Sequence, residues 1–393
     1  MKVINGDSLE ELKKLDSESI EALITDPPYG LSKMTTENIQ ECLTNWLAGK
    51  EYNHKEKGFM NKKWDSFVPS PELWKEVYRV MKHGAHGLVF AGTRTQDLMS
   101  ISLRLAGFEV KDTLMWVYGS GFPCGNLNIS KAIDKKLGLE RKVVGKQKMT
   151  GTARKVKGTS TNTQNLNMAN DYEYEETYID ITEPASDDAK KYNGWGTRLK
   201  PAYEPILLIK KPTKNKIVDN VLNTGCGAIN IDATRIETSD DLARVNNQDN
   251  GMFSVGNGRN KAQIHKDMGL PKLGRWPANV MIDDHIDHED MKRYFFTSKA
   301  SKKEREAGLS HIDSKRANIH PTVKPLDLMR YLVKLITPPN GTALDPFCGS
   351  GSTLCALALE SMEGIGIELS KEYCEIAEAR IKHWEAERKS RLL

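Results

Sequence analysis

Short apolar runs alternate with longer amphipathic segments over the first 117 residues of the chain. Short, mostly apolar runs are typical of buried strands, whereas apolar positions spaced roughly three to four residues apart are typical of helices. The pattern predicts strands at 2–5, 22–25, 87–92 and 110–117, and helices at 9–15, 71–81 and 95–106. Strands separated by helices indicate a parallel sheet with helices on both faces. The residues from Gly30 to about Pro69 are polar and are expected to form a long connection.

The same alternation returns near the C-terminal end, after a middle region of different character. Between about 211 and 319, Gly, Asn and Asp are frequent and apolar periods are short, which indicates an inserted small domain. From Pro325 on, the pattern predicts helices at 326–337, 353–361 and 371–388 and strands at 342–344 and 364–368. We therefore expect one α/β sheet that is interrupted and then resumed, with domain ranges 1–212, 213–318 and 319–393.

Composition is typical of a protein in the reducing cytoplasm. The six cysteines form no CxxC pair and the nine histidines show no HExxH spacing, so we expect neither a disulfide framework nor a metal site. The N-terminus is too charged for a signal peptide, and no apolar run is long enough to cross a bilayer. A cytoplasmic protein with no membrane partner is therefore expected.

The net charge is only +4, but the charges are unevenly distributed along the chain. Residues 131–157 hold ten Lys or Arg against two acids, whereas 171–188 holds eight acids and no Lys or Arg. A run of charges is often only a solvated face. Because the basic run is also rich in Gly, Thr and Ser, we expect it to form a polar loop that can lie along phosphates, with Arg154 and Lys155 among its contacts. This run is the first part of a basic and acidic loop expected at about 131–192.

The stretch GTALDPFCGSGSTLCALALESMEGIGIELS, residues 341–370, has the pattern of a cofactor loop. An apolar strand leads into Asp345, two glycines form the turn, a helix follows, and the next strand ends in Glu368, which can accept ribose hydroxyls. The third glycine of a dinucleotide fingerprint and the lysine of a P-loop are both missing. S-adenosylmethionine fits better, because it has no phosphates and carries a sulfonium cation that an acidic loop suits. The residues expected to bind it here are Asp345, Phe347, Gly349, Ser350, Gly351, Thr353 and Glu368.

The stretch TDPPYG, residues 25–30, ends a short apolar strand abruptly. Pro27 and Pro28 fix the backbone and carry no N–H, so they present carbonyls without a competing donor. Asp26 and the Pro27 carbonyl can accept the two N–H groups of an exocyclic amine, while Tyr29 stacks on the planar base. A base within a duplex must be flipped out to reach such a pocket. The simpler alternative is a proline-rich turn without a catalytic role.

Together, these two stretches resemble the amino-group DNA methyltransferases of the permuted β class. In that class the DPPY motif is N-terminal, target recognition is central and the glycine-rich motif is C-terminal, and this chain has the same order. Further matches lie at 5–7 (NGD), 195–211 and 320–325 (HPTVKP). The resemblance implies a circularly permuted, Rossmann-like class I methyltransferase fold with an inserted recognition domain, and double-stranded DNA as partner. It also implies that Asp7 lies near the adenine ring of the cofactor and Lys324 beside its methionine part.

The resemblance favours adenine N6 as the methylated atom. Relatives that act on cytosine N4 more often have Ser in place of the aspartate, so Asp26 favours adenine, although both amines need the same two acceptors. Methylation of RNA or of a protein glutamine is a more distant alternative, and the central insertion and the basic loop favour duplex DNA instead. A catalytically silent DNA-binding module is a further class, which the intact Asp26, Tyr29 and Glu368 disfavour.

Basic and aromatic residues in three segments are candidates for DNA contacts. The loop after the catalytic motif can contact the DNA backbone or fill the gap left by a flipped base, although an aromatic that caps the core is an equal alternative. Arginines of the central region can contact phosphates or base edges. The candidates are Lys62, Lys63, Trp64, Arg154, Lys155, Arg259 and Arg275.

Weaker patterns point elsewhere. Pro123-Cys124 is similar to the nucleophile of cytosine-C5 methyltransferases, but those enzymes lack DPPY, so an ordinary loop cysteine is favoured. His285 and His288 lie in DDHIDHED, which is more simply an acidic helix surface than a metal site. The resemblance leaves open a homodimer and a cognate restriction enzyme.

Overall fold

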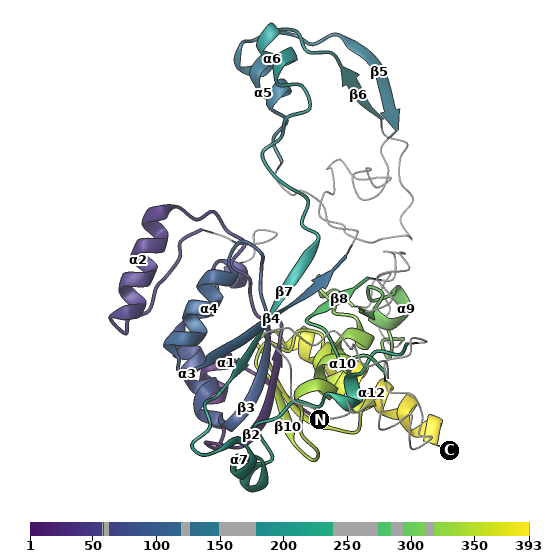
Figure 1. Ribbon diagram of the computed structural model, residues 1–393. Helices are drawn as coiled ribbons and strands as arrows, with labels where there is room; N and C mark the ends of the chain where they lie inside the picture. Colours follow the sequence, from purple (N-terminus) through teal and green to yellow (C-terminus); the bar gives the residue numbers. More distant parts are fainter. Residues whose placement is uncertain are drawn as a thin grey trace, which may run out of the picture. The chain divides into compact units, whose positions relative to one another are not determined.

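The computed structural model describes residues 1–56, 58, 63–118, 126–148, 178–238, 274–283, 294–310 and 318–392 (Figure 1). The chain divides into two compact units, one of residues 1–119 with 203–393 and the other of residues 120–202. The larger unit contains a nine-stranded sheet. Its strands are β1 (Lys2–Asn5), β2 (Ile20–Thr25), β3 (Met81–Phe90), β4 (Glu109–Val117), β7 (Tyr203–Lys210), β8 (Val280–Ile282), β9 (Phe295–Phe296), β10 (Thr342–Asp345) and β11 (Glu363–Glu368).

Neighbouring strands of this sheet follow the order β1-β11-β10-β2-β3-β7-β4-β8-β9. Neighbours pair in parallel except at β7, which runs antiparallel to both β3 and β4. The expected Rossmann-like, mostly parallel sheet is confirmed. The antiparallel strand is not visible in the sequence pattern, because an apolar run does not specify strand direction. β2 and β10 are direct neighbours, with Leu23 opposite Leu344, so the two ends of the chain share one sheet.

Helices cover both faces of the large sheet (Figure 1). The helices of this unit are α1 (Ser8–Leu12), α2 (Thr36–Leu47), α3 (Pro71–Val80), α4 (Gln96–Leu105), α7 (Ile217–Thr224), α9 (Lys302–Arg305), α10 (Leu326–Ile336), α11 (Ser352–Leu359) and α12 (Lys371–Leu392), with short 3-10 helices η2 (Lys63–Asp65) and η4 (Asp232–Thr234). α1, α3 and α4 share one core with Val89 of β3, whereas α10 and α11 share the other with Leu88 and Phe90. Successive side chains of a strand point to opposite faces, and this alternation divides the two cores.

The polar segment 30–69 contains a helix that the sequence pattern did not predict. α2 begins with a capping box, in which Thr35 and Asn38 each accept a hydrogen bond from the other's backbone N–H. Its inner side buries Cys42 and Trp46. Few of its positions are apolar, so the cap and the packing of these two side chains determine the helix rather than a long apolar stripe.

Residues 120–202 form the second compact unit. The domain ranges 1–212, 213–318 and 319–393 stay a prediction. β8 and β9, which come from 213–318, extend the edge of the large sheet. A role of 213–318 in target recognition stays a prediction. His285 and His288 lie outside the described residues. Within the described ranges, no helix combines the length and the apolar character that a bilayer crossing requires.

The smaller unit is built around a buried ion pair. It contains α5 (Ile129–Lys136), α6 (Asp187–Lys191) and an antiparallel pair of strands, β5 (Val143–Lys148) and β6 (Tyr178–Thr182). The buried Asp134 accepts a hydrogen bond from Arg141 Nη1 at 2.6 Å and from the backbone N–H groups of Ala185 and Ser186 at 3.0 Å. Removing one member of such a pair leaves a buried charge uncompensated. Arg141 therefore serves the fold of this unit, although it belongs to the basic run 131–157.

The core that α10 and α11 form with the sheet depends on its buried leucines. Leu332 of α10 has no exposed surface, whereas Leu47 at the end of α2 is 75% exposed. Leu332→Ala should lower the free energy of unfolding by about 2–5 kcal/mol, because it leaves a cavity in a packed core. Leu47→Ala, the matched control, should change it by no more than about 0.5 kcal/mol. Urea unfolding of both variants measures the difference, and equal losses would contradict this description of the core.

Candidate active site

Asp345 joins the two motifs at the carboxyl ends of β2 and β10. It is buried, and its carboxylate accepts hydrogen bonds from Thr25 Oγ1 at 2.7 Å, Thr353 Oγ1 at 2.6 Å and the backbone N–H of Phe347 at 3.1 Å. Burial raises the pKa of Asp345 to about 6, and these hydrogen bonds only partly oppose the shift. Both carboxylate oxygens thus bind the protein itself and fix the turn after β10. Contact of Asp345 with a sulfonium stays a prediction.

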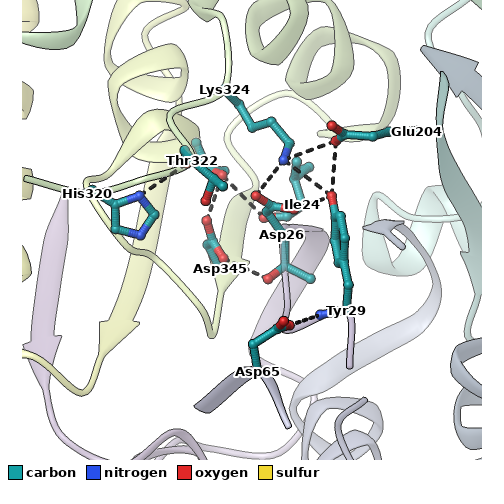
Figure 2. Close-up of polar contacts among 11 residues, drawn as sticks. Ile24, Asp26, Tyr29, Asp65, Glu204, His320, Thr322, Lys324 and Asp345 are labelled. Carbon is teal, nitrogen blue, oxygen red and sulfur yellow. Dashed lines mark hydrogen bonds and ion pairs between the residues drawn. The ribbon is translucent and has the colours of Figure 1, made fainter. Parts of the chain in front are cut away.

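The backbone of the TDPPYG segment is held on both sides of Tyr29. Asp65 of η2 accepts hydrogen bonds from the backbone N–H of Tyr29 at 2.8 Å and of Gly30 at 3.1 Å (Figure 2). Thr95 Oγ1 donates to the Tyr29 carbonyl at 2.5 Å. Neither Asp65 nor Thr95 was predicted as a partner of Tyr29, since they lie 36 and 66 residues from it along the chain. They leave the tyrosine backbone little freedom to move.

The side chains of the motif meet a buried lysine and a second carboxylate (Figure 2). Lys324 Nζ lies 2.6 Å from Asp26 Oδ2, 3.2 Å from Glu204 Oε2 and 3.3 Å from the Tyr29 hydroxyl. The Tyr29 hydroxyl lies 2.7 Å from Asp26 Oδ1 and 3.0 Å from Glu204 Oε2. With both carboxylates ionised, these four side chains, which we call the charge cluster, carry a net charge of −1.

The surroundings fix the protonation states of two members of the charge cluster. Burial lowers the pKa of Lys324, but the charges of Asp26 and Glu204 outweigh it, so the pKa of this ammonium is raised above its usual range. Burial, reinforced by the same two carboxylates, raises the pKa of Tyr29 well above its usual range. Lys324 therefore stays charged and Tyr29 keeps its proton at neutral pH.

The position of Lys324 adds to what the sequence suggested for it. Its ammonium contacts Asp26 and Tyr29 of TDPPYG, and contact with the methionine part of a cofactor stays a prediction. Glu204 was missed, and the only signal available was its place in the matched segment 195–211. It stands near the start of β7, opposite Trp116 of β4.

The glycine loop requires glycine at two positions. Gly349 has φ +52° and Gly351 has φ +77°, in the left-handed region that other residues rarely adopt. A Cβ on Gly349 would lie 2.7 Å from His320 Nε2, and one on Gly351 would lie 2.9 Å from the Cβ of Ala377. His320, in the matched segment 320–325, therefore lies directly against the loop.

Glu368 and Arg380 hold this loop from two sides. The Glu368 carboxylate accepts hydrogen bonds from the backbone N–H of Gly349 at 2.9 Å and of Ser370 at 2.8 Å, and burial raises the pKa of Glu368. The fully buried Arg380 of α12 donates through Nη1 to the Ser350 carbonyl at 2.5 Å and to its hydroxyl at 3.1 Å. Arg380 was not predicted, because no local motif marks it.

The N-terminal segment 5–7 lies beside Glu368. Asn5 Nδ2 and the backbone N–H of Gly6 both donate to the Glu368 carbonyl at 3.0 Å. The Asp7 carboxylate caps α1 by accepting from the backbone N–H of Leu9 at 3.0 Å. Its contact with an adenine ring stays a prediction. The predicted Phe347 packs edge-on against Trp74, with ring centroids 6.2 Å apart.

The candidates for DNA contacts are only partly described. Trp64 precedes the buried Asp65 and is 44% exposed. Arg275 Nε donates to Thr238 Oγ1 at 3.4 Å, and the backbone of Arg275 forms an isolated antiparallel bridge with Ile236. No group of three or more potential metal ligands occurs among the residues that the structure describes. Outside the described residues lie Lys62, Cys124, Arg154, Lys155, Arg259 and the side chain of Lys63.

A family model and similar curated proteins point to the same family. A family model described as DNA methylase matches residues 20–379. The Type II methyltransferase M.HindIII of Haemophilus influenzae is 24% identical over 96% of this chain and 94% of its own length. The DNA adenine methyltransferase YhdJ of Escherichia coli is 21% identical over 98% of this chain and 85% of its own. The solved M1.HpyAVI-SAM complex covers 97% of this chain and 98% of its own at 17% identity, with a TM-score of 0.42.

Titration of Asp345 should be visible in stability. Because its pKa rises from 3.8 to about 6 on folding, its protonated form favours the folded state. That contribution is fully present below about pH 4 and is lost as pH rises through about 6. Relative to Asp345→Asn, which does not titrate, the wild type should lose on the order of 2–3 kcal/mol between pH 4 and 7. Urea unfolding of both proteins across this range measures it, and parallel pH curves would contradict the assignment.

Proposed function

The chain belongs to the DNA methylase family, and from this premise we propose that it methylates the exocyclic N6 of a flipped-out adenine in double-stranded DNA, with S-adenosylmethionine as methyl donor. The observation that carries the proposal is the juxtaposition of two motifs. β2 ends in Asp26 to Tyr29, β10 leads into the glycine loop, and these two strands are parallel neighbours. The carboxyl ends of adjacent parallel strands are where open α/β sheets bind their ligands.

The glycine loop suits the cofactor. S-adenosylmethionine, when bound, supplies an electrophilic methyl group on a sulfonium. Gly349 and Gly351 keep the loop free of side chains that would collide with neighbouring residues, and Glu368 lies at the end of the next strand, where it can accept ribose hydroxyls. These residues therefore fit the cofactor of the family.

The catalytic motif suits an amine. Asp26 Oδ1 accepts from Tyr29 and Oδ2 from Lys324, but each carboxylate oxygen can accept a further hydrogen bond. Asp26 and the Pro27 carbonyl can therefore still accept the two N–H groups of a base. The fixed backbone of Tyr29 holds its ring ready for stacking, so little ordering is left for the moment of binding.

Adenine is the proposed base for two reasons. Asp26 stands where cytosine-N4 relatives more often have serine. YhdJ, which is similar over nearly the whole chain, is named as a DNA adenine methyltransferase. Cytosine N4 is the alternative, because it presents the same pair of N–H groups.

Product analysis tests the proposal. Unmethylated duplex DNA is incubated with the protein and labelled S-adenosylmethionine, digested to nucleosides and analysed by mass spectrometry. We expect N6-methyldeoxyadenosine. N4-methyldeoxycytidine would correct the base while keeping the chemistry, and the absence of any labelled nucleoside would overturn the proposal.

Asp26→Ala should lower methyl transfer by at least about 100-fold, because the amine loses one of its two acceptors. Binding of S-adenosylmethionine, measured by calorimetry, should be largely retained, since Asp26 is not among the loop residues. Asp187→Ala, a carboxylate with 98% side-chain exposure in the smaller unit, is the matched control and should be fully active. Full activity of Asp26→Ala would refute the catalytic assignment.

The basic run of the smaller unit is proposed to contact DNA phosphates. Arg141 is engaged with Asp134, so the test uses Arg154, Lys155 and Lys157 instead. Replacing all three with Gln should weaken binding to all DNA sequences and flatten the dependence of log K on log salt by up to about 0.9 per lost phosphate contact. The control replaces Lys190 and Lys191 of the same unit with Gln, which should leave the salt dependence unchanged. An unchanged salt slope in the triple variant would remove this segment from the DNA interface.

A further inference from the structure

The Tyr29 hydroxyl bridges two carboxylates. It lies 2.7 Å from Asp26 Oδ1 and 3.0 Å from Glu204 Oε2, so the two acids are connected through one phenolic oxygen (Figure 2). A hydroxyl has one proton to donate and can accept further hydrogen bonds. It can therefore donate to only one of the two carboxylates at a time, while it accepts from the other once that acid is protonated. This is the arrangement that a proton relay requires.

The proposed reaction leaves a proton to be removed. When the amine nitrogen uses its lone pair to form the new bond to carbon, it becomes positively charged and carries one proton more than the neutral product. Asp26 is the group expected to touch that nitrogen, so it is the first acceptor. A protonated Asp26 beside the charged Lys324 cannot serve the next amine, so the proton must leave it.

We propose that Glu204 is the terminal proton acceptor of the reaction, reached from Asp26 through the hydroxyl of Tyr29. This inference rests on the proposed function. The N–H bond breaks with its electron pair left on nitrogen, and the proton passes to Asp26. Asp26 then gives a proton to the Tyr29 oxygen while the original hydroxyl proton moves to Glu204. Asp26 and Tyr29 return to their starting states, nothing is oxidised or reduced, and Glu204 becomes a neutral acid.

Glu204 is placed to complete the cycle. Its side chain is 23% exposed, and it lies beyond Asp26 and Tyr29 on the proposed path, so it can release the proton to water while the base covers Asp26. The charge cluster changes from −1 to neutral when it takes up the proton. A net negative charge before transfer stabilises the positive nitrogen as it forms.

Lys324 acts in this scheme as a fixed counter-ion and not as a carrier. A protonated ammonium has no lone pair with which to accept a proton. It lies within 3.3 Å of Asp26, Glu204 and the Tyr29 oxygen, so it holds all three in reach of one another. One ammonium cannot neutralise two carboxylates, which leaves the cluster able to take up one proton.

The test compares Glu204→Gln, which keeps the shape but cannot take the proton, with Tyr29→Phe, which keeps the stacking ring but removes the hydroxyl. Each should slow multiple-turnover methyl transfer by about 100-fold, because Asp26 must lose its proton before it can serve the next amine. The affinities for S-adenosylmethionine and for duplex DNA should stay within about twofold of the wild type, which a merely structural role would not preserve. The double variant should be no slower than the slower single variant, because both changes break one path. Glu363→Gln, which alters a side chain that is 74% exposed on β11, is the matched control.

Chemical rescue gives a second readout. Glu204→Ala leaves space for a small acid, so added formate should restore part of its methyl transfer, whereas formate should not affect Glu363→Ala. Wild-type rates in both Glu204→Gln and Tyr29→Phe would overturn the inference, and so would fully additive losses in the double variant. Absence of any methylated nucleoside from the wild type would instead overturn the proposed function, so the two failures are distinguishable.

Discussion

The parallel pairing of β2 with β10 is the constraint on which the site depends. The two strands come from opposite ends of the chain. Thr25 donates a hydrogen bond to Asp345, although the two residues are 320 positions apart in sequence. Parallel neighbours end at the same edge of a sheet, so the catalytic motif and the glycine loop emerge side by side. The buried Asp345 fixes this alignment, because it also accepts from Thr353 at the start of α11. Two motifs that are far apart in sequence thus share one edge of the sheet.

Charge balance is the second constraint, and it explains why a buried lysine is tolerated. Removing a charge from water is costly unless partners compensate for it. Lys324 lies between Asp26 and Glu204 and has the rings of Phe90 and Tyr29 nearby, with its ammonium 4.8 Å from the centroid of Phe90. The compensation comes from the groups that are proposed to act on the substrate. Stability and chemistry therefore use the same four side chains.

Sequence predicted the parts of the site that are local in the chain. The strand ends, the two glycines and TDPPYG are short patterns whose geometry follows from neighbouring residues, and the structure has strands and turns where these patterns indicate them. Glu204, Asp65 and Arg380 could not be predicted in this way. Each acts through a contact made across the fold, such as Arg380 with Ser350. The place of Glu204 in the matched segment 195–211 was the only local signal for any of the three. The antiparallel direction of β7 was hidden for the same reason, and it is β7 that contributes Glu204 to the cluster.

Tyr29 is the residue at which these constraints converge. Its backbone is held by Asp65 and Thr95, and its hydroxyl is held by the two carboxylates, so the ring is fixed from both ends. Stacking on a base requires only an aromatic face, which phenylalanine or tryptophan would also supply. A hydroxyl at this position is needed only if a proton must pass between Asp26 and Glu204, or if the two carboxylates must be linked by hydrogen bonds. The hydroxyl of Tyr29 is thus better explained by the carboxylate of Glu204 than by the base. With Glu204 as its partner, Tyr29 has a proposed chemical role beyond stacking.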